Sequence, residues 1–428
     1  MSTQRGFYGW KLVGVLSSLD CLNLGLPAYG GAVINSYMLQ QIPMSRSTLG
    51  FGFTLMNLFV GLPATLVAIS IVRQGIRRTY LIGSALICAG SLLLAFASHP
   101  WQYLVGFGIL NGMGICFGDI VPGTTAVARW FKRYRGRATG LVLSGSGISG
   151  FLAAPLLDKL IRAHDGNWRL GWEFIAGAAI FGGILAFLFI RERPEDLGQR
   201  MDGATDEETA ASEAQGSAEL VSDYAWTPAQ AYRTRAYWLI VLGGLAAQFP
   251  FFFFSAQWIL HLQGAGISSS DAAFAMGLFT VACIGGRLIG GWMMDTMTAR
   301  YAFMLGLCCY LIGSVAALRV GPNALTIAYS AAILYGLAIG WTFTCMTTCV
   351  AHFYGPVAFP KLAGMLILLT SGGASPAGLI GGRIFDATGS YTRAFELNIL
   401  IALIGIVAMA FARMPRPSDC RVALAQAA

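Results

Sequence analysis

Residues Phe274–Tyr301 read FAMGLFTVACIGGRLIGGWMMDTMTARY. The stretch is apolar, rich in glycine and long enough for an α-helix to cross a bilayer. One charge, Arg287, lies well inside it, and Asp295 closes the apolar run eight residues later. At about 1.5 Å of rise per residue, Arg287 is roughly 12 Å from that boundary. A cation at membrane depth costs at least about 2.5 kcal/mol to insert, so it normally faces a cavity or a partner and marks a substrate path. The alternative is an arginine held in a structural ion pair.

The composition of the chain is that of a polytopic membrane protein. Of its 428 residues, 56% are hydrophobic and 11% are charged, and the mean hydropathy is +0.64. A soluble domain carries about 25% charged residues. The net charge of +8 does not indicate nucleic-acid binding, because the cations cluster in short loops between apolar runs. The nine cysteines lie almost all in apolar runs without metal-ligand spacing, and no phosphate loop occurs. We therefore predict no enzyme activity, no cofactor and no metal site.

Twelve runs are long enough to span a membrane as helices of roughly 20 residues. The expected spans are 10–37, 48–72, 80–97, 101–128, 138–157, 172–190, 237–264, 271–294, 301–318, 324–350, 362–385 and 395–412. The sequence thus predicts an all-α membrane protein with an N-terminal six-helix bundle over residues 1–190 and a C-terminal six-helix bundle over residues 236–428. The polar stretch 191–235 lacks apolar periodicity and is expected to be a cytoplasmic linker with a short surface helix near 227–232.

The two halves repeat each other at an offset of 223 or 224 residues. Arg77 matches Arg300, and Gly112 matches Gly336. The same offset relates further pairs across three spans, which is the internal symmetry of transporters whose halves rock around a central substrate site. Arg287 corresponds to Ala64, so this charge belongs to one half only.

The distribution of cations predicts the orientation of the chain. With the N-terminus inside, most of the 28 Lys and Arg residues fall in inside segments, which places both termini and the linker in the cytoplasm. The chain contains no Asn-x-Ser/Thr glycosylation acceptor, which fits a multi-pass protein of a bacterial inner membrane.

Two carboxylates lie at a depth similar to that of Arg287. Asp20 is nine residues past Lys11, and Asp119 is ten residues before Arg129, so each is roughly 14–15 Å deep by helical rise. A buried carboxylate without a partner favours its protonated form, whereas one near an arginine favours the charged form. The hypothesis is that Asp119 or Asp20 alternates between a proton and a partnership with Arg287. Alternatively, each aspartate satisfies a local polar contact.

Other polar or aromatic side chains on apolar spans are candidates to line a substrate path. Asn111 and Tyr335 are repeat mates and are expected at matching depth in opposite halves. The further candidates are Asn23, Ser144, Phe253, Gln257 and Cys283. For Ser144 the alternative is close packing of small residues between helices, and for most of the aromatic residues it is packing against lipid.

Several segments resemble the monocarboxylate transporter family of the major facilitator superfamily, whose bacterial relatives include the oxalate/formate antiporters. Residues 130–140, WFKRYRGRATG, with the following SGSG at 144–147, are similar to the signature of the fourth and fifth helices. Residues 385–391, FDATGSY, resemble the end of helix 11. The loop motif of the superfamily survives as Gly75, Arg77 and Arg78 after the second span, and its second copy keeps Gly291, Asp295 and Arg300.

The resemblance implies a role for Arg287, which matches the helix 8 arginine that pairs with a substrate carboxylate. Two positions depart from the family: Cys283 stands where an aspartate is frequent, and Ala28 follows Pro27 where animal members carry a proton-linked lysine. The helix 11 lysine of the antiporters is also missing, since residues 362–380 hold no Lys or Arg. One fixed cation suits a monoanion better than a dianion.

The sequence therefore predicts a secondary active transporter of a small monocarboxylate, such as lactate or pyruvate, coupled to a proton and working as a monomer in the lipid bilayer. An organic-anion exchanger and a transporter of a larger aromatic carboxylate are the nearest alternatives. A receptor that keeps the fold is a third, although no appended folded domain supports it.

Overall fold

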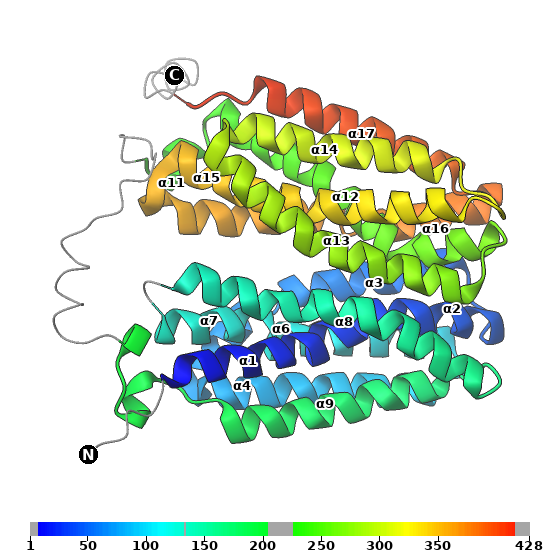
Figure 1. The fold of residues 1–428 in the computed structure, drawn as a ribbon, viewed down its shortest axis with the longest axis horizontal. Coiled ribbons are helices and arrows are strands. Elements are labelled where there is room, and N and C mark those ends of the chain that lie inside the picture. The colour runs from blue at the N-terminus through cyan, green and yellow to red at the C-terminus, as the bar shows by residue number, and fades with distance from the viewer. Residues whose placement is uncertain (1–6, 132–133, 204–225, 416–428) are drawn as a thin grey trace. The chain divides into compact units, whose positions relative to one another are not determined.

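The computed structural model describes residues 7–131, 134–203 and 226–415, and these residues form helices and loops without a strand. They divide into two compact units, each of which has its own set of packed helices (Figure 1). The first unit comprises Met1–Met44 and Leu55–Ala218, and the second comprises Ser45–Thr54 and Glu219–Ala428. The expected all-helical membrane architecture is confirmed. The proposed domain boundaries at residues 190 and 235 stay predictions.

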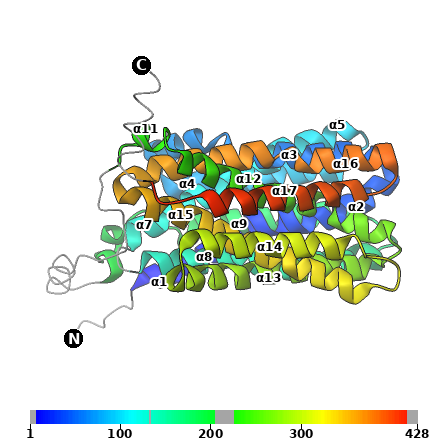
Figure 2. The same cartoon turned by 90° about the horizontal axis from the view of Figure 1, so that it is seen from above.

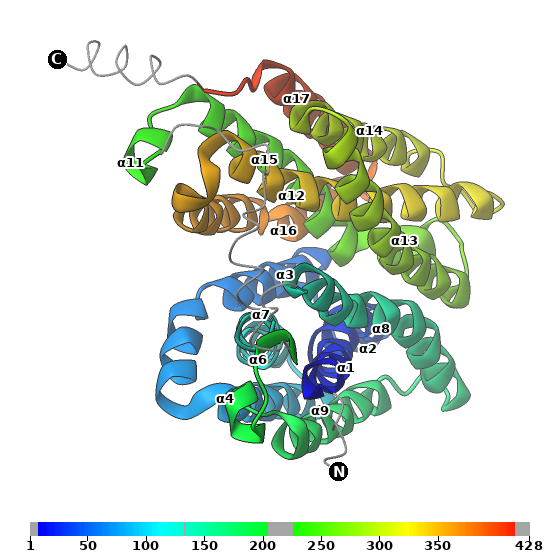
Figure 3. The same cartoon turned by 60° about the vertical axis from the view of Figure 1, so that its left-hand side comes forward.

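The first unit is built mainly from long apolar helices. In chain order its elements are α1 (Tyr8–Asp20), η1 (Cys21–Gly30), α2 (Gly31–Gln41), the end of α3 (Arg46–Gly61), α4 (Ala64–Ala95), α5 (Pro100–Tyr103), η2 (Leu104–Asn111), α6 (Gly112–Gly118), α7 (Ile120–Trp130), α8 (Arg135–Ala163) and α9 (Arg169–Phe189), followed by the short η3 (Pro194–Leu197) and η4 (Met201–Gly203). Helix α7 contacts α4, α1 and α8, and α6 packs against α4 and η1; Figure 3 shows α6 and α7 between α4 and the helices α1 and α8.

The second unit contains α11 (Pro228–Ala231), α12 (Arg235–Gly264), α13 (Ser269–Thr296), α14 (Ala299–Ala317), α15 (Leu325–Ala374), α16 (Ala377–Thr388) and α17 (Thr392–Phe411). Helix α17 lies along both α12 and α14, and α15 packs against α13 (Figure 2). The short α11 coincides with the surface helix expected near residues 227–232, and the Thr227 hydroxyl caps it by accepting from the N–H of Gln230. Residues 204–225 of the expected linker lie outside the described part of the chain.

Eleven helices among the described residues are long and apolar enough to cross a membrane, whereas the sequence led us to expect twelve. The difference lies in the expected span 48–72. Helix α3 ends at Gly61 after 16 residues, and the chain re-enters a helix at Ala64. Pro63, which precedes Ala64, lacks an N–H and crowds the preceding turn, and here the helix is interrupted at this proline.

Two glycines with positive φ allow sharp changes of direction between consecutive spans. Gly75 has φ 88° within α4, and Gly355 has φ 73° within α15. These angles are accessible to glycine at no steric cost. At Gly355 the chain turns from the expected span 324–350 into the next one, so α15 consists of two helical segments that meet at this glycine.

Residues Ser45–Thr54 precede most of the first unit in sequence but belong to the second unit. The Arg46 guanidinium donates to the Tyr391 hydroxyl at 3.0 Å and covers the ring of Phe385. The backbone N–H groups of Arg46 and Ser47 donate to the Asp386 carboxylate at 3.2 and 3.0 Å. Burial raises the pKa of the Tyr391 hydroxyl to about 12, although the neighbouring arginine opposes that shift. The segment 385–391, singled out by resemblance, thus holds the start of α3.

Candidate functional site

Arg287 lies on the membrane-spanning helix α13 of the second unit, and its side chain is half-buried. Cys283, one turn earlier, is close enough to interact electrostatically with the guanidinium. Both residues sit on the part of α13 that is packed tightly against α15, so the position of the cation depends on that helix contact.

The contact between α13 and α15 brings the two backbones together through glycines. A Cβ at Gly340 of α15 would overlap the carbonyl oxygen of Cys283 and lie 2.8 Å from the backbone N of Arg287. A Cβ at Gly286 of α13 would overlap the carbonyl oxygen of Leu337. Small residues allow such close approach of membrane helices. Two of the glycines that flank Arg287 in sequence, Gly286 and Gly290, therefore serve the helix contact.

Near Cys283, a cluster of buried polar groups lies among α14, α15 and α17 of the same unit. Tyr310 of α14 interacts electrostatically with both Cys283 and Tyr335. The Tyr335 hydroxyl is 2.7 Å from that of Ser314 and accepts from the Asn398 amide at 3.3 Å. The hydroxyl of Tyr310 and the amide oxygen of Asn398 are buried without a hydrogen-bond partner. Electrostatic interactions thus link Arg287 through Cys283 and Tyr310 to the expected site residue Tyr335.

Phe253 and Gln257 of α12 are also buried, and the partners described for both side chains are other residues of the second unit. The Gln257 amide donates to the carbonyl oxygen of Gly378 at 2.8 Å and accepts from the Tyr391 hydroxyl at 2.7 Å. Phe253 packs edge-on against Phe395, with ring centroids 5.2 Å apart. Both residues therefore hold α12 against α16 and α17 in this structure.

The first unit brings Asp20 and Asp119 together. Both carboxyl groups are buried, with 0% and 2% of each residue exposed, and a hydrogen bond joins the two side chains. Asp20 also accepts a hydrogen bond from the backbone N–H of Ser146 on α8. Asp119 has no cation partner within the described residues. A hydrogen bond between two carboxyl groups requires a proton on one of them, because two adjacent carboxylates in a buried setting repel each other.

The backbone at Asp119 places its carboxyl group where α6 ends and α7 begins. Helix α6 stops at Gly118, whose carbonyl oxygen accepts from the Asn23 amide at 2.8 Å. The Tyr80 hydroxyl donates to the carbonyl oxygen of Asp119 at 3.4 Å. The Asn23 side chain of η1 thus supplies a hydrogen bond to the Gly118 carbonyl at the end of α6, whereas the Asp119 carbonyl also accepts from the backbone N–H of Gly123 at 2.8 Å. The expected span 101–128 corresponds to one apolar span, Pro100–Trp130, within which α5, η2, α6 and α7 follow one another.

The remaining expected residues of the first unit do not join this pair. Asn111 is fully buried at the end of η2, and neither polar atom of its amide has a hydrogen-bond partner. Ser144 donates to the carbonyl oxygen of Leu141 within its own helix at 2.7 Å. Asn23 is bound to Gly118, as described above.

The expected residues thus form two groups, one in each unit: Asp20 and Asp119 in the first, and Arg287, Cys283 and Tyr335 in the second. Three members of the second group were not foreseen: Tyr310, Ser314 and Asn398. In the sequence, these three residues are marked only by a polar group within an apolar span. The described residues contain no cluster of His, Cys, Asp and Glu that could hold a metal ion.

Comparisons with known proteins agree with this architecture. The model of the Major Facilitator Superfamily matches residues 21–359. Monocarboxylate transporter 12 of Homo sapiens is 25% identical over 357 residues, covering 78% of this chain and 67% of that protein. Monocarboxylate transporter 13 of Rattus norvegicus is 26% identical over 333 residues, covering 78% and 72%.

Solved structures show the same fold at low sequence identity. A bacterial homologue of the human lysosomal transporter Spinster, in an inward-facing and unoccupied conformation, has a TM-score of 0.73 at 15% identity and covers 99% of both chains. A nucleoside transporter has a TM-score of 0.72 at 12% identity and covers 93% of this chain and 99% of its own. The chain therefore belongs to the Major Facilitator Superfamily and is a multi-pass membrane transporter.

Proposed function

We propose that this protein is a secondary active transporter that moves a small monocarboxylate together with a proton by alternating access. The observation that carries the proposal is Arg287, a cation within the membrane-spanning helix α13. A guanidinium offers paired N–H donors that match the two oxygens of a carboxylate. The similarity to monocarboxylate transporters supports this substrate class.

The buried pair Asp20–Asp119 is the proposed proton site. Its hydrogen bond lies among apolar helices, where gain or loss of a proton changes the charge of the pair. The earlier hypothesis that one aspartate also pairs with Arg287 stays a prediction. In the proposed orientation, both termini face the cytoplasm of a bacterial cell, as the distribution of cations predicts.

Uptake of labelled lactate into proteoliposomes, with and without an inward proton gradient, tests the proposal. Wild-type protein should accumulate lactate above its external concentration, and Arg287→Gln should abolish uptake because the carboxylate then loses its ion pair. Arg383→Gln, at an exposed arginine of α16, is the matched control and should behave as wild type. Uptake by Arg287→Gln at the wild-type rate would exclude the assigned role.

An exchanger of organic anions is the second candidate, and the phenylalanine-rich part of α12 favours an aromatic carboxylate for it. Phe254 stacks on Tyr335, with ring centroids 4.5 Å apart, beside the polar cluster that leads to Arg287. In this case labelled substrate should enter only when unlabelled carboxylate is trapped inside, and the proton gradient should have no effect. Phenylpyruvate and lactate compared in one counterflow assay distinguish the two substrate sizes.

A further inference from the structure

In the first unit, helices α4 and α9 pack along each other and leave a groove of about 610 Å³ between them (Figure 1). Ile184 and Phe187 of α9 line this groove, and each has about half of its surface exposed. Both helices are long and apolar enough to cross a membrane. The groove therefore opens toward the hydrocarbon region of the bilayer rather than toward water. The small residues that line it are Ala85, Ala89, Ala179 and Gly183.

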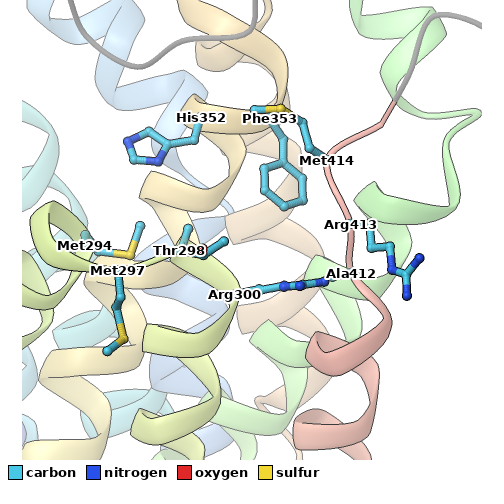
Figure 4. Close-up of a pocket in the computed structure, with 10 residues that line it drawn as sticks. Met294, Met297, Thr298, Arg300, His352, Phe353, Ala412, Arg413 and Met414 are labelled. Atoms are coloured by element: carbon cyan, nitrogen blue, oxygen red, sulfur yellow. The ribbon is translucent and has the colours of Figure 1, made fainter.

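The lining of the groove is apolar. A second cavity, of about 800 Å³ in the second unit, has Arg300 and His352 among its lining residues (Figure 4). The described residues that line the groove include no charged side chain, and the hydroxyl of Ser84 accepts from the Asn23 amide at 3.4 Å. A surface of this kind gains free energy by covering hydrocarbon, so it suits an apolar chain rather than a polar solute.

The small residues of the groove are not required by the packing of the two helices. The corresponding helices of the second unit, α14 and α17, also contact each other. Each corresponding position there holds a larger residue. At offsets of 223 residues for α4 and 224 for α9, the residues Ala85, Ala89, Ala179 and Gly183 correspond to Cys308, Ile312, Leu403 and Val407. The first unit thus leaves space where the second unit has side chains.

One end of the groove lies beside a group of arginines. Arg77 is one turn before Leu81, which lines the groove. The Arg77 guanidinium lies 5.9 Å from the centre of the Phe187 ring, which also lines it. Arg73 and Arg78 are exposed at the same turn of the chain. Positive charge is therefore placed where the apolar surface ends.

The acid described at this turn already has partners. The Glu192 carboxylate accepts from the backbone N–H groups of Ile76 and Arg77 at 2.9 and 3.0 Å. It also pairs with the Arg129 guanidinium at 3.0 Å. Four arginines of α4 and α7 thus accompany one carboxylate, so this turn carries an excess of positive charge within the described residues.

The length of the groove matches one leaflet of a bilayer. Leu81 and Leu92 both line it and are eleven residues apart on α4, which corresponds to roughly 16 Å of helical rise. The hydrocarbon core is about 30 Å thick, so one leaflet contributes about 15 Å. A single acyl chain can therefore follow the groove from the arginines to the middle of the membrane.

We propose that this groove binds one acyl chain of an anionic phospholipid, whose phosphate lies at Arg77 and Arg78. Basic side chains at the end of a crevice between membrane helices attract anionic lipid headgroups. The apolar lining holds the chain, and the positive charge selects the headgroup. The site does not depend on which substrate the protein transports.

Native mass spectrometry of the full-length protein in detergent tests the proposal by counting bound lipids. The probes are dioleoyl phosphatidylglycerol, which is anionic, and dioleoyl phosphatidylcholine, which has the same acyl chains and no net charge. We expect one molecule of phosphatidylglycerol to bind saturably and about tenfold more tightly than phosphatidylcholine, because of the two arginines at the headgroup.

Two variants test the headgroup contact. Arg77→Gln and Arg78→Gln should each reduce the preference for phosphatidylglycerol about threefold, since each removes one positive charge. Binding of phosphatidylcholine should not change. Arg78 is exposed, so its variant keeps the test informative if Arg77→Gln is poorly folded. Arg319→Gln, at an exposed arginine past the end of α14, is the matched control and should bind as wild type.

A further variant fills the groove with residues that the second repeat carries. Ala89→Ile combined with Gly183→Val should weaken the binding of both lipids about tenfold. A Cβ at Gly183 would lie 3.5 Å or more from its neighbours, so the fold should tolerate the change, and an unaltered unfolding temperature would verify this. Ala68→Ile, at an exposed alanine of α4 outside the groove, is the control.

Three outcomes would overturn the proposal. Equal affinity of the wild type for the two lipids would remove the role of the arginines. Wild-type lipid binding by the filled variant would place the lipid elsewhere. A dimer that the filled variant dissociates, together with no saturable lipid binding, would assign the groove to a second copy of the chain.

Discussion

At the scale of single residues, the two aspartates of the first unit differ from the other buried acid there. Asp158 of α8 accepts from the Tyr37 hydroxyl at 2.7 Å and pairs with Arg162 at 2.9 Å. Asp119 shares a hydrogen bond with Asp20 instead of a cation. A carboxylate with a cationic partner is stabilised in its charged form, whereas a carboxyl pair retains a proton. The pair is therefore the better candidate for proton transfer.

Replacing Asp119 by Asn should uncouple transport from the proton gradient while preserving exchange. The amide keeps the size and the hydrogen bond to Asp20 but cannot release a proton. In proteoliposomes, Asp119→Asn should bring labelled lactate only to its external concentration under a proton gradient, yet still support counterflow. Asp158→Asn is the matched control, and it should accumulate substrate as wild type does. Gradient-driven accumulation by Asp119→Asn would contradict the assignment.

At the scale of helices, the contact between α13 and α15 determines where Arg287 lies. Gly286 and Gly340 place backbone against backbone, so the cation is held by main-chain packing as well as by its own side-chain contacts. Interiors of this kind transmit strain because they have little free volume. A change at Gly340 should therefore act on substrate binding even though glycine itself offers no functional group.

Gly340→Ala should destabilise the protein by about 1–3 kcal/mol through overpacking, because the added Cβ overlaps the carbonyl oxygen of Cys283. The unfolding temperature should fall, and the affinity for carboxylate should fall with it as α13 shifts. Gly291→Ala, where an added Cβ meets no atom within 4 Å, should leave both quantities unchanged. Equal unfolding temperatures of the two variants would contradict the close approach of α15 to α13 at Gly340.

At the scale of the whole molecule, two structural repeats carry different chemistry. The first unit holds the acidic pair Asp20–Asp119, and the second holds Arg287. The shared scaffold accounts for the fold, whereas the charges that differ between the repeats account for the proposed function. The orientation of this scaffold in the membrane is a separate prediction from the distribution of cations.

Single cysteines test that orientation in a variant from which the nine native cysteines have been removed. A cysteine at Gln199, after the last span of the first unit, should react with an impermeant maleimide only in inside-out vesicles. A cysteine at Asn323, in the loop between α14 and α15, should react only in right-side-out cells. The opposite pattern would invert the proposed topology.

The sequence was sufficient for those features that depend on long apolar runs and isolated charges. Arg287 stood out because a cation within an apolar span is rare. The break at Pro63 was missed because its neighbours are apolar on both sides, and hydropathy does not register a missing N–H. The contact of Asp20 with Asp119 needed the structure, since equal depth does not specify which helices are neighbours. Tyr310 and Asn398 were missed because uncharged polar residues are common in spans.

The hydrogen bond between Asp20 and Asp119 also has a consequence for the response to membrane voltage. A pair that retains one proton carries a single negative charge, which balances the single positive charge of Arg287. Binding one proton and one monoanion adds no net charge, so the empty and the loaded carrier cross the membrane with the same charge. Moving an uncompensated charge would involve about 2.3 kcal/mol per 100 mV. The proposed transport cycle is therefore electroneutral, and a potassium diffusion potential should neither drive nor slow it.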